Sequence, residues 1–211
     1  MKFQQYFSTK TVRKIDVTNN IDTIRRLILK YIEIDDLEWL YCSSLFSIEY
    51  INKKDVLLLQ GSTCRNVYFV ISGLLRIYFV NYKGEEKTFH FSIENTFAAD
   101  YESFLKDIPS SFAIQALEDT IVMKITLEKL EDFYKKVRNG EKLGRLIAED
   151  YFFIVSDKIK AIYTQTPIER YNAMNAKFPK ILQRIPQHYI ASYLNISSVH
   201  LSRLKKYAAE E

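Results

Sequence analysis

The sequence predicts an α+β fold in which an antiparallel β-roll is followed by a long helix and a C-terminal helix-turn-helix. Short β-rich segments separated by glycines and charged turns fill the first half of the chain, as in β-sandwiches and barrels. An apolar stripe at helical spacing covers residues 141–164. Residues 185–207 have the pattern of two short helices joined by a tight turn. Together these observations place a β-domain, a long helix and a small helical domain in that order.

These patterns divide the 211 residues into four parts. Residues 1–20 are polar and predict an N-terminal arm. Residues 21–138 hold the β-roll with its flanking helices. Residues 139–164 form the long helix, and residues 165–211 the helix-turn-helix domain. The last boundary follows from a capping box, in which Thr166 precedes Pro167 and Glu169 at a new helix start.

Seven strands are expected in the roll. Gly61, Gly73 and Gly84 fall at breaks between them, where a rolled sheet needs tight bends or positive φ. Helical periodicity precedes the roll over residues 21–41, and a further helix is expected over residues 127–137. A short helix and a loop are expected within residues 95–111. The strands are expected at residues 47–51, 56–59, 66–72, 74–81, 86–92, 112–116 and 120–126.

The stripe of the long helix is wide enough to need two neighbours. One would be the β-roll and the other the same helix of a second copy, so we predict a homodimer; a single buried core helix is the alternative. Phe152 and Phe153 extend the stripe. Its members are Leu143, Ile147, Tyr151, Ile154, Ile159 and Ile162.

The tail has the features of a DNA-binding helix-turn-helix. Ala191 is small enough for a second helix to cross closely, Asn195 tolerates positive φ in the turn, and Ser197 is a suitable N-cap. From residue 156 onward, nine Lys or Arg residues stand against four Asp or Glu. An ordinary αα-hairpin lacks this combination, so double-stranded DNA is the expected partner. The expected contact residues are Ser197, Ser198, Val199, His200, Ser202, Arg203, Lys205 and Lys206.

The composition also argues against several classes of protein. Cys42 and Cys64 are too few for a disulfide framework or a four-ligand metal site, and we expect them to be reduced thiols of a cytoplasmic protein. The N-terminus lacks the apolar core of a signal peptide, and no segment has the roughly 20 apolar residues of a membrane span. No catalytic constellation stands out, so we expect no enzyme, no metal and no membrane contact.

The order of parts, together with the segment GSTCRNVYFVISG from Gly61 to Gly73, resembles the Crp/Fnr family of bacterial transcription factors. The resemblance covers roughly residues 21–207. It implies a cyclic-nucleotide-binding-like roll, dimers joined through the long helix, DNA binding, and contact with RNA polymerase. Many members hold a cyclic nucleotide or another effector in the roll.

The nucleotide-binding motif of that family is altered here. The family pattern F-x-G-E, followed after ten residues by R-S or R-T, keeps Phe97 but has Ala99 for Gly and Asp100 for Glu. Ser110 stands for the Arg that would pair with the phosphate, and Ser111 keeps the hydroxyl. We therefore expect no usual response to cyclic AMP, and no cofactor is assigned beyond an unidentified small-molecule effector. The candidate pocket residues are Phe97, Ala99, Asp100, Tyr101, Ser110 and Ser111.

The recognition helix differs from that of the best-known members, because Ser198 and Val199 replace their Arg-Glu pair while Arg203 matches their second base-reading Arg. A different operator is therefore expected. Only four residues follow Tyr207, so we expect no C-terminal wing. Two alternatives stay open. One is a ligand-binding or partner-binding β-roll protein with a vestigial helix-turn-helix. The other is a cupin-like enzyme, which the single roll histidine, His90, disfavours.

Overall fold

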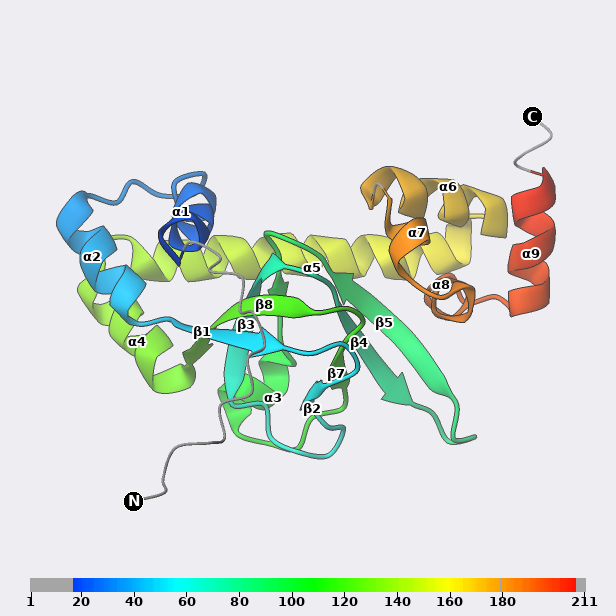
Figure 1. Cartoon of the computed structure of the whole chain (residues 1–211), viewed down its shortest axis with the longest axis horizontal. Coiled ribbons are helices and arrows are strands. Elements are labelled where there is room, and N and C mark those ends of the chain that lie inside the picture. Colours follow the sequence, from blue (N-terminus) through cyan, green and yellow to red (C-terminus); the bar gives the residue numbers. More distant parts are fainter. Residues whose placement is uncertain (1–16, 179, 208–211) are drawn as a thin grey trace, which may run out of the picture.

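The computed structural model describes residues 17–178 and 180–207 (Figure 1). Three helices gather at one end of the molecule, the β-roll lies in the middle, and a helical head lies at the other end. A single long helix, α5 (Gly140–Thr164), runs from the end with the three helices, along the β-roll, to the head (Figure 1). The arm expected over residues 1–20 falls largely outside the described residues, but its last four residues already belong to helix α1 (Val17–Ile28).

The roll consists of two four-stranded sheets in which all recorded neighbours pair antiparallel. One sheet has the order β1-β8-β3-β6 and the other the order β2-β7-β4-β5. All seven expected strands are present, and the two-residue β6 is an eighth that the sequence did not predict. The strands are β1 (Ser47–Ile51), β2 (Val56–Leu58), β3 (Asn66–Ser72), β4 (Leu75–Val80), β5 (Glu86–Ser92), β6 (Phe97–Ala98), β7 (Ala113–Ala116) and β8 (Thr120–Thr126).

The space between the two sheets is filled by apolar side chains. Val70, Leu75, Ile114 and Val122 are inaccessible to solvent there. Gly73 begins the turn between β3 and β4 with φ +104°, and a Cβ at this position would lie 2.4 Å from the Thr120 Oγ1 atom. The expectation of a glycine-dependent bend is therefore confirmed, because any other residue would be strained and would collide.

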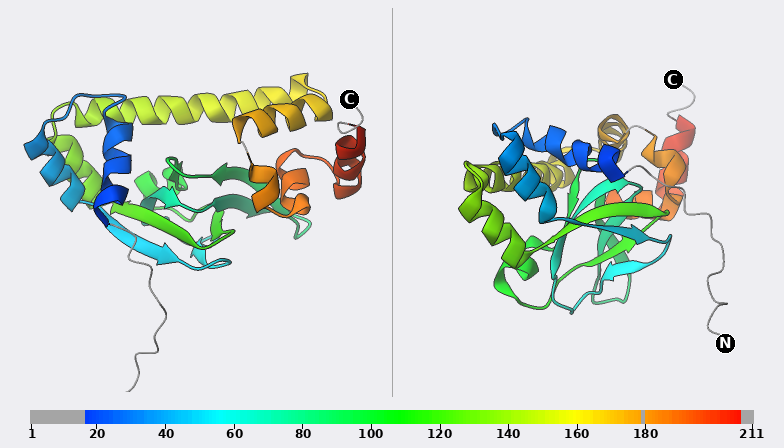
Figure 2. Two further views of the ribbon diagram at one scale, coloured as in Figure 1. Left: turned by 45° about the horizontal axis from the view of Figure 1, so that its top comes forward. Right: turned by 60° about the vertical axis from the view of Figure 1, so that its left-hand side comes forward.

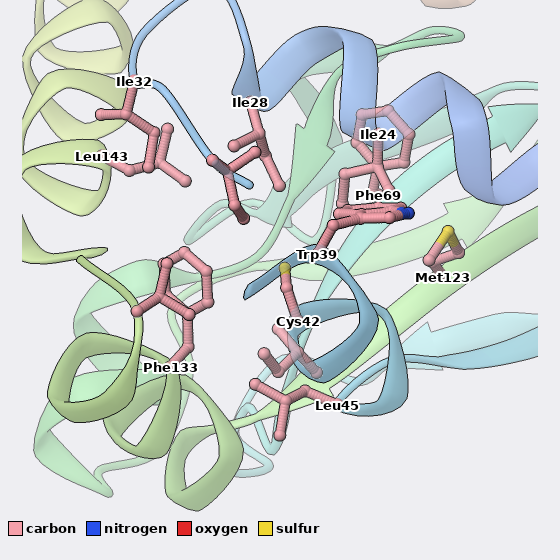
Figure 3. Close-up of a cluster of buried hydrophobic side chains, with 13 residues drawn as sticks. Ile24, Ile28, Ile32, Trp39, Cys42, Leu45, Phe69, Met123, Phe133 and Leu143 are labelled. Carbon is pink, nitrogen blue, oxygen red and sulfur yellow. The ribbon is translucent and has the colours of Figure 1, made fainter. Parts of the chain in front are cut away.

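The outer face of the β1-β8-β3-β6 sheet is covered by helices. They are α1, α2 (Asp36–Ser44), α4 (Leu127–Lys136) and the first turns of α5. Figure 3 shows Ile24 and Ile28 of α1, Trp39 of α2 and Phe133 of α4 in one buried cluster with the strand residue Phe69. The helices that flank the roll in sequence therefore share one core with it.

The head contains four helices: α6 (Pro167–Lys177), α7 (Ile181–Arg184), α8 (Gln187–Tyr193) and α9 (Ser198–Tyr207). Thr166 and Glu169 form the expected capping box at the start of α6, with Pro167 in the first turn. The four-residue helix α7 was not predicted. Figure 2 shows α5 lying along one side of the roll and the head packed against the far end of the sheets. Leu74 and Phe91 of the roll join Ile190 and Leu201 of the head in one buried cluster.

Candidate functional site

Helices α8 and α9 form a helix-turn-helix with the expected turn. Asn195 has φ +56°, in the left-handed region that Asn tolerates. The Ser197 hydroxyl accepts a hydrogen bond from the backbone N–H of His200 at 3.2 Å, which confirms it as the N-cap of α9. Ala191 and Leu201 are buried where the two helices meet. Local sequence features therefore account for the turn between α8 and α9 and for the residue at which α9 begins.

The outer face of α9 is polar, cationic and open. Val199 has 63% of its surface exposed, and Arg203 and Lys206 are exposed one and two turns further on. Lys205 is half-buried, which distinguishes it from the other expected contact residues. Within its described residues, α9 carries no acidic residue in its first turn and two lysines in its last turn. The remaining expected contact residues, Ser197, Ser198, His200 and Ser202, are all exposed.

The motif residues of the roll do not form one pocket. The buried carboxylate of Asp100 accepts hydrogen bonds from the Ser110 hydroxyl at 2.7 Å and from the Ser111 N–H at 3.1 Å. Its other oxygen accepts from the Ser103 N–H and caps the short helix α3 (Tyr101–Lys106). The Asp100 carboxylate therefore satisfies the donors around it. We call residues 97–111, which contain these groups, the cassette.

The other three candidate pocket residues face a different space. Phe97, Ala99 and Tyr101 line a cavity between the roll and α5, and Asp100, Ser110 and Ser111 do not line it. The expectation that all six residues line one ligand pocket is thus corrected, because Asp100 and its two serines are bonded to one another while these three face α5.

Helix α5 has two apolar faces, and only one of them packs against other parts of the chain. Leu143 is buried against the roll cluster, Ile147 packs on it, and Tyr151 and Ile154 line the cavity. Four of the six residues assigned to the dimer helix therefore face the roll or the cavity beside it, which is the first of the two neighbours expected for this stripe, and pairing with a second copy stays a prediction.

The second face of α5 is open to solvent. It contains Phe152, which is 66% exposed, and Ile159, which is 51% exposed. With Ala148, Val155 and Ile162, they recur at alternating steps of four and three residues, the spacing of a coiled-coil seam. Phe153 and Tyr163 flank this seam and are exposed as well. In the sequence, the residues of this seam and the residues that face the roll belong to one apolar stripe.

The metal-donor groups and the cysteines of the described residues bear on metal binding and on cysteine reactivity. No group of three or more His, Cys, Asp or Glu within them could hold a metal ion. Both cysteines are free and buried, and burial raises the pKa of the Cys42 thiol to about 12, so it stays protonated. In the same part of the chain, no helix combines the length and the apolarity that crossing a bilayer requires.

Residues 48–137 match the family model of the cyclic nucleotide-binding domain. A comparison with curated proteins found no significant match. Among solved structures, FixK2 from Bradyrhizobium japonicum superposes with a TM-score of 0.68 at 15% identity, covering 78% of this chain and 85% of FixK2.

A crp/fnr family protein from Eubacterium rectale, named as a transcriptional regulator, gives a TM-score of 0.65 at 17% identity, covering 84% of this chain and 87% of its own. The chain has the Crp/Fnr fold. The c-di-GMP responsive regulator CLP from Xanthomonas campestris gives a TM-score of 0.62 at 14% identity, with 90% and 92% covered. The shared architecture of the Crp/Fnr fold, including the roll, long helix and head, therefore extends over nearly the whole described chain.

In this example of the Crp/Fnr fold, the head is fastened to the roll by two arginines that sequence reasoning missed. Arg184 of α7 donates to Glu94 at 2.7 Å and to the Gly73 carbonyl at 3.0 Å, and also pairs with Glu118. The two carboxylates raise the pKa of Arg184 further above its usual value. These partners are far apart in sequence, so no local pattern indicates them.

The second arginine, Arg76 of β4, is completely buried. Its guanidinium lies 4.3 Å from the ring centroid of Tyr78 and 3.8 Å from that of Tyr189 on α8. Beside it, the Ser192 hydroxyl of α8 accepts from the Thr88 N–H at 2.8 Å. The helix that supports α9 is therefore held directly against strands β4 and β5.

Proposed function

We propose that this protein is a transcription regulator that binds double-stranded DNA as a homodimer, with α9 in the major groove. The observation that carries the proposal is the exposed cationic face of α9, presented by a capped helix-turn-helix at the far end of a Crp/Fnr fold (Figure 1). A helix in this setting can enter the groove while the helix before it crosses the backbone.

The side chains of α9 divide into base-reading and phosphate-binding roles. Arg203 is exposed and can pair bidentately with a guanine edge, and Val199 presents methyl groups suited to a thymine methyl. Lys206 lies at the end of the helix, where a cation meets phosphate and positions the helix without reading sequence. His200 and Ser202, both exposed, supply further groove or phosphate contacts.

The homodimer would form along the second face of α5. Two copies of the seam that contains Phe152 and Ile159 would bury apolar side chains that one chain leaves in water. Because each copy carries a head at the end of this helix, the two α9 helices would reach half-sites about one helical turn apart.

We infer further that the roll does not take cyclic AMP in the way the family motif implies. A buried cyclic phosphate needs charge-assisted hydrogen bonds. Here the Asp100 carboxylate already accepts from Ser110 and Ser111, so a phosphate at that point would meet a second anion. CLP is named for its response to c-di-GMP, so proteins with this fold do not all share one effector.

The proposal is tested by selecting bound duplexes from a randomised DNA pool and then comparing variants on the selected site. Arg203→Ala should weaken binding by about 1–3 kcal/mol and relax the preference at one base pair. Lys129→Ala is the matched control, because Lys129 is an exposed cation on α4 at the opposite end of the molecule. Failure to enrich any duplex would contradict DNA recognition and favour a ligand-binding roll with a vestigial head.

A further inference from the structure

A cavity of about 340 Å³ lies between the roll and its covering helices. Its walls come from α1, α4 and α5 and from the outer face of the β1-β8-β3-β6 sheet. Ile24, Ile28, Phe133 and Leu143, four of the side chains that line it, are drawn in Figure 3. The lining is almost entirely apolar, and the volume falls in the range of small-molecule sites.

This cavity is separate from the interior of the roll. The interior between the sheets is filled by side chains such as Val70 and Ile114, and the cassette beside it is closed by the Asp100–Ser110 hydrogen bond. The cavity shares Phe97 and Ala99 with the nucleotide motif, but Asp100, Ser110 and Ser111 do not line it. It therefore leaves out the part of the motif that would hold the phosphate.

A lysine of the head lines the cavity. Lys177, the last residue of α6, lines the cavity and is exposed to solvent, and the buried His90 of β5 lines it nearby. Lys158 of α5 lies behind His90, with its ammonium on the Phe89 carbonyl and 4.1 Å from the Tyr193 ring centroid. Among the described residues, neither Lys158 nor Lys177 makes an ion pair with a carboxylate.

The charges around Lys177 are electrostatically unbalanced. Burial, reinforced by Lys177, lowers the pKa of Lys158 to about 7, and burial with both lysines lowers the pKa of His90 to about 3. An anion placed beside the two lysines would offset the repulsion between their ammonium groups. The single carboxylate among the described lining residues, Asp150, already accepts the Tyr31 hydroxyl at 2.5 Å.

We propose that this cavity binds a medium-chain aliphatic carboxylate, with the hydrocarbon chain among Ile24, Ile28 and Leu143 and the carboxylate beside Lys177. Removal of the hydrocarbon chain from water supplies the affinity. The Lys177 ammonium favours a negatively charged headgroup on the ligand over a neutral one. Binding itself does not depend on DNA; a role as effector rests on the proposed function.

The site also connects the ligand to the head. Lys177 and the buried Phe178 belong to the head, His90 to β5 and Tyr151 to α5. The His90 ring lies 6.1 Å from Tyr151 and 6.2 Å from Phe178 between centroids. A bound carboxylate would therefore contact all three parts at once and favour one placement of α6 over another.

The first experiment titrates the full-length protein with dodecanoate by calorimetry, without DNA and below the micellar concentration. Dodecanoate should bind in the micromolar range, and dodecan-1-ol at least tenfold more weakly. Lys177→Gln should weaken dodecanoate at least tenfold and leave dodecan-1-ol unchanged, whereas the control Lys129→Gln should alter neither. Equal binding of the acid and the alcohol, or no effect of Lys177→Gln, would overturn the proposal.

A second variant tests the apolar walls. Ile147→Trp adds volume inside the cavity and should abolish binding of both ligands, with folding checked by circular dichroism. Unchanged dodecanoate binding in a folded Ile147→Trp protein would place the ligand elsewhere. If this variant does not fold, Lys177→Gln still tests the site, because Lys177 is exposed and its replacement should leave folding unchanged.

The effector role is then measured by titrating the selected operator with and without saturating dodecanoate. A change in operator affinity of at least threefold is expected. An unchanged affinity would contradict the coupling to the head, while the calorimetric result would still stand for the binding site. A protein that binds dodecanoate but no DNA would separate failure of the proposed function from failure of this inference.

Discussion

The head and the cassette of the roll are both places where a Crp/Fnr fold can meet a phosphate, and they have diverged in opposite directions. In the head, the turn at Asn195 and the cap at Ser197 are intact, and Arg203 and Lys206 are left open to solvent. In the cassette, Ser110 stands where the family motif has an arginine, and Asp100 occupies the donors that would face the anion.

Under the proposed function, one fold keeps anion recognition at one surface and loses it at another. Exposed cations on a helix need no buried partner, so they preserve an anion site at little cost in stability. A buried site without its arginine must satisfy its donors internally, and the Asp100 carboxylate does so. The proposed function therefore combines DNA binding at the head with exclusion of a cyclic phosphate from the cassette.

The largest expected effect tests how the two heads are brought together. Ile159→Glu places a carboxylate in the open seam of α5, where it should prevent pairing of two copies. Light scattering should show a monomer, and operator affinity should fall about a hundredfold or more, because each head then binds alone.

The matched control for this variant is Lys142→Glu, which changes an exposed polar position on the same helix. This control should remain a dimer with little change in operator affinity. An Ile159→Glu protein that stays dimeric would show that the open face of α5 is not the dimer interface.

The second effect concerns the closed cassette. Asp100→Ala removes the acceptor shared by Ser110, Ser111 and Ser103, and should lower the free energy of unfolding by about 3 kcal/mol, as expected for buried donors left unpaired. Glu102→Ala, an exposed acid on the same helix, should cost about 0.5 kcal/mol. Urea unfolding measures both, and equal losses would mean that Asp100 does not hold the cassette closed.

The third effect is a dependence of stability on pH at the junction between roll and head. The pKa of Lys158 is about 7 in the folded protein and 10.5 ordinarily, so unfolded chains bind more protons between these values. Stability should therefore rise with pH, by roughly 1–2 kcal/mol from pH 7 to pH 9. The charged groups around it are Lys177 and Asp157, and the buried His90 stays neutral over this range.

Urea unfolding at several pH values, compared with Lys158→Met, checks this dependence. The variant should have a flatter profile than the unmodified protein between pH 7 and pH 9. Identical slopes in the two proteins would mean that Lys158 is not desolvated at the junction.

The smallest effect sharpens the description of α9. Lys206→Ala should weaken binding to all duplexes alike, severalfold, and reduce the slope of log affinity against log salt by about one unit. Lys205→Ala should have less effect on the slope, because Lys205 is half-buried. Filter binding at several salt concentrations measures both, and a sequence-dependent loss in Lys206→Ala would mean that this lysine contacts bases instead.

Much of this fold could be predicted because its signals are local. The bounds of β1, β3, β5 and β8 agree with the sequence patterns to the residue. The capping box at Thr166 and the positive φ of Asn195 also depend on neighbouring residues alone. Strand β6, by contrast, pairs with β3 through only two residues, too few to show a period.

The candidate site was predicted less completely because its contacts are long-range. Periodicity identifies the apolar residues of α5 but cannot separate those facing the roll, such as Tyr151, from those facing solvent, such as Phe152. The Arg184 pairs with Glu94 and Glu118 join residues 90 and 66 positions apart. Nor does the sequence show that Phe97 lines the cavity while Asp100, three residues later, is hydrogen-bonded to Ser110 and Ser111 instead.

The most direct test of the account is where and how the protein contacts a selected duplex. Selection from a randomised pool, followed by footprinting and guanine-methylation interference, should give two inverted half-sites centred about one helical turn apart. Methylation of one guanine in each half-site should block binding of the unmodified protein and have little further effect on Arg203→Ala. The account of DNA recognition by α9 would be contradicted if no sequence were enriched, or if a single half-site were recovered that Arg203→Ala binds equally well.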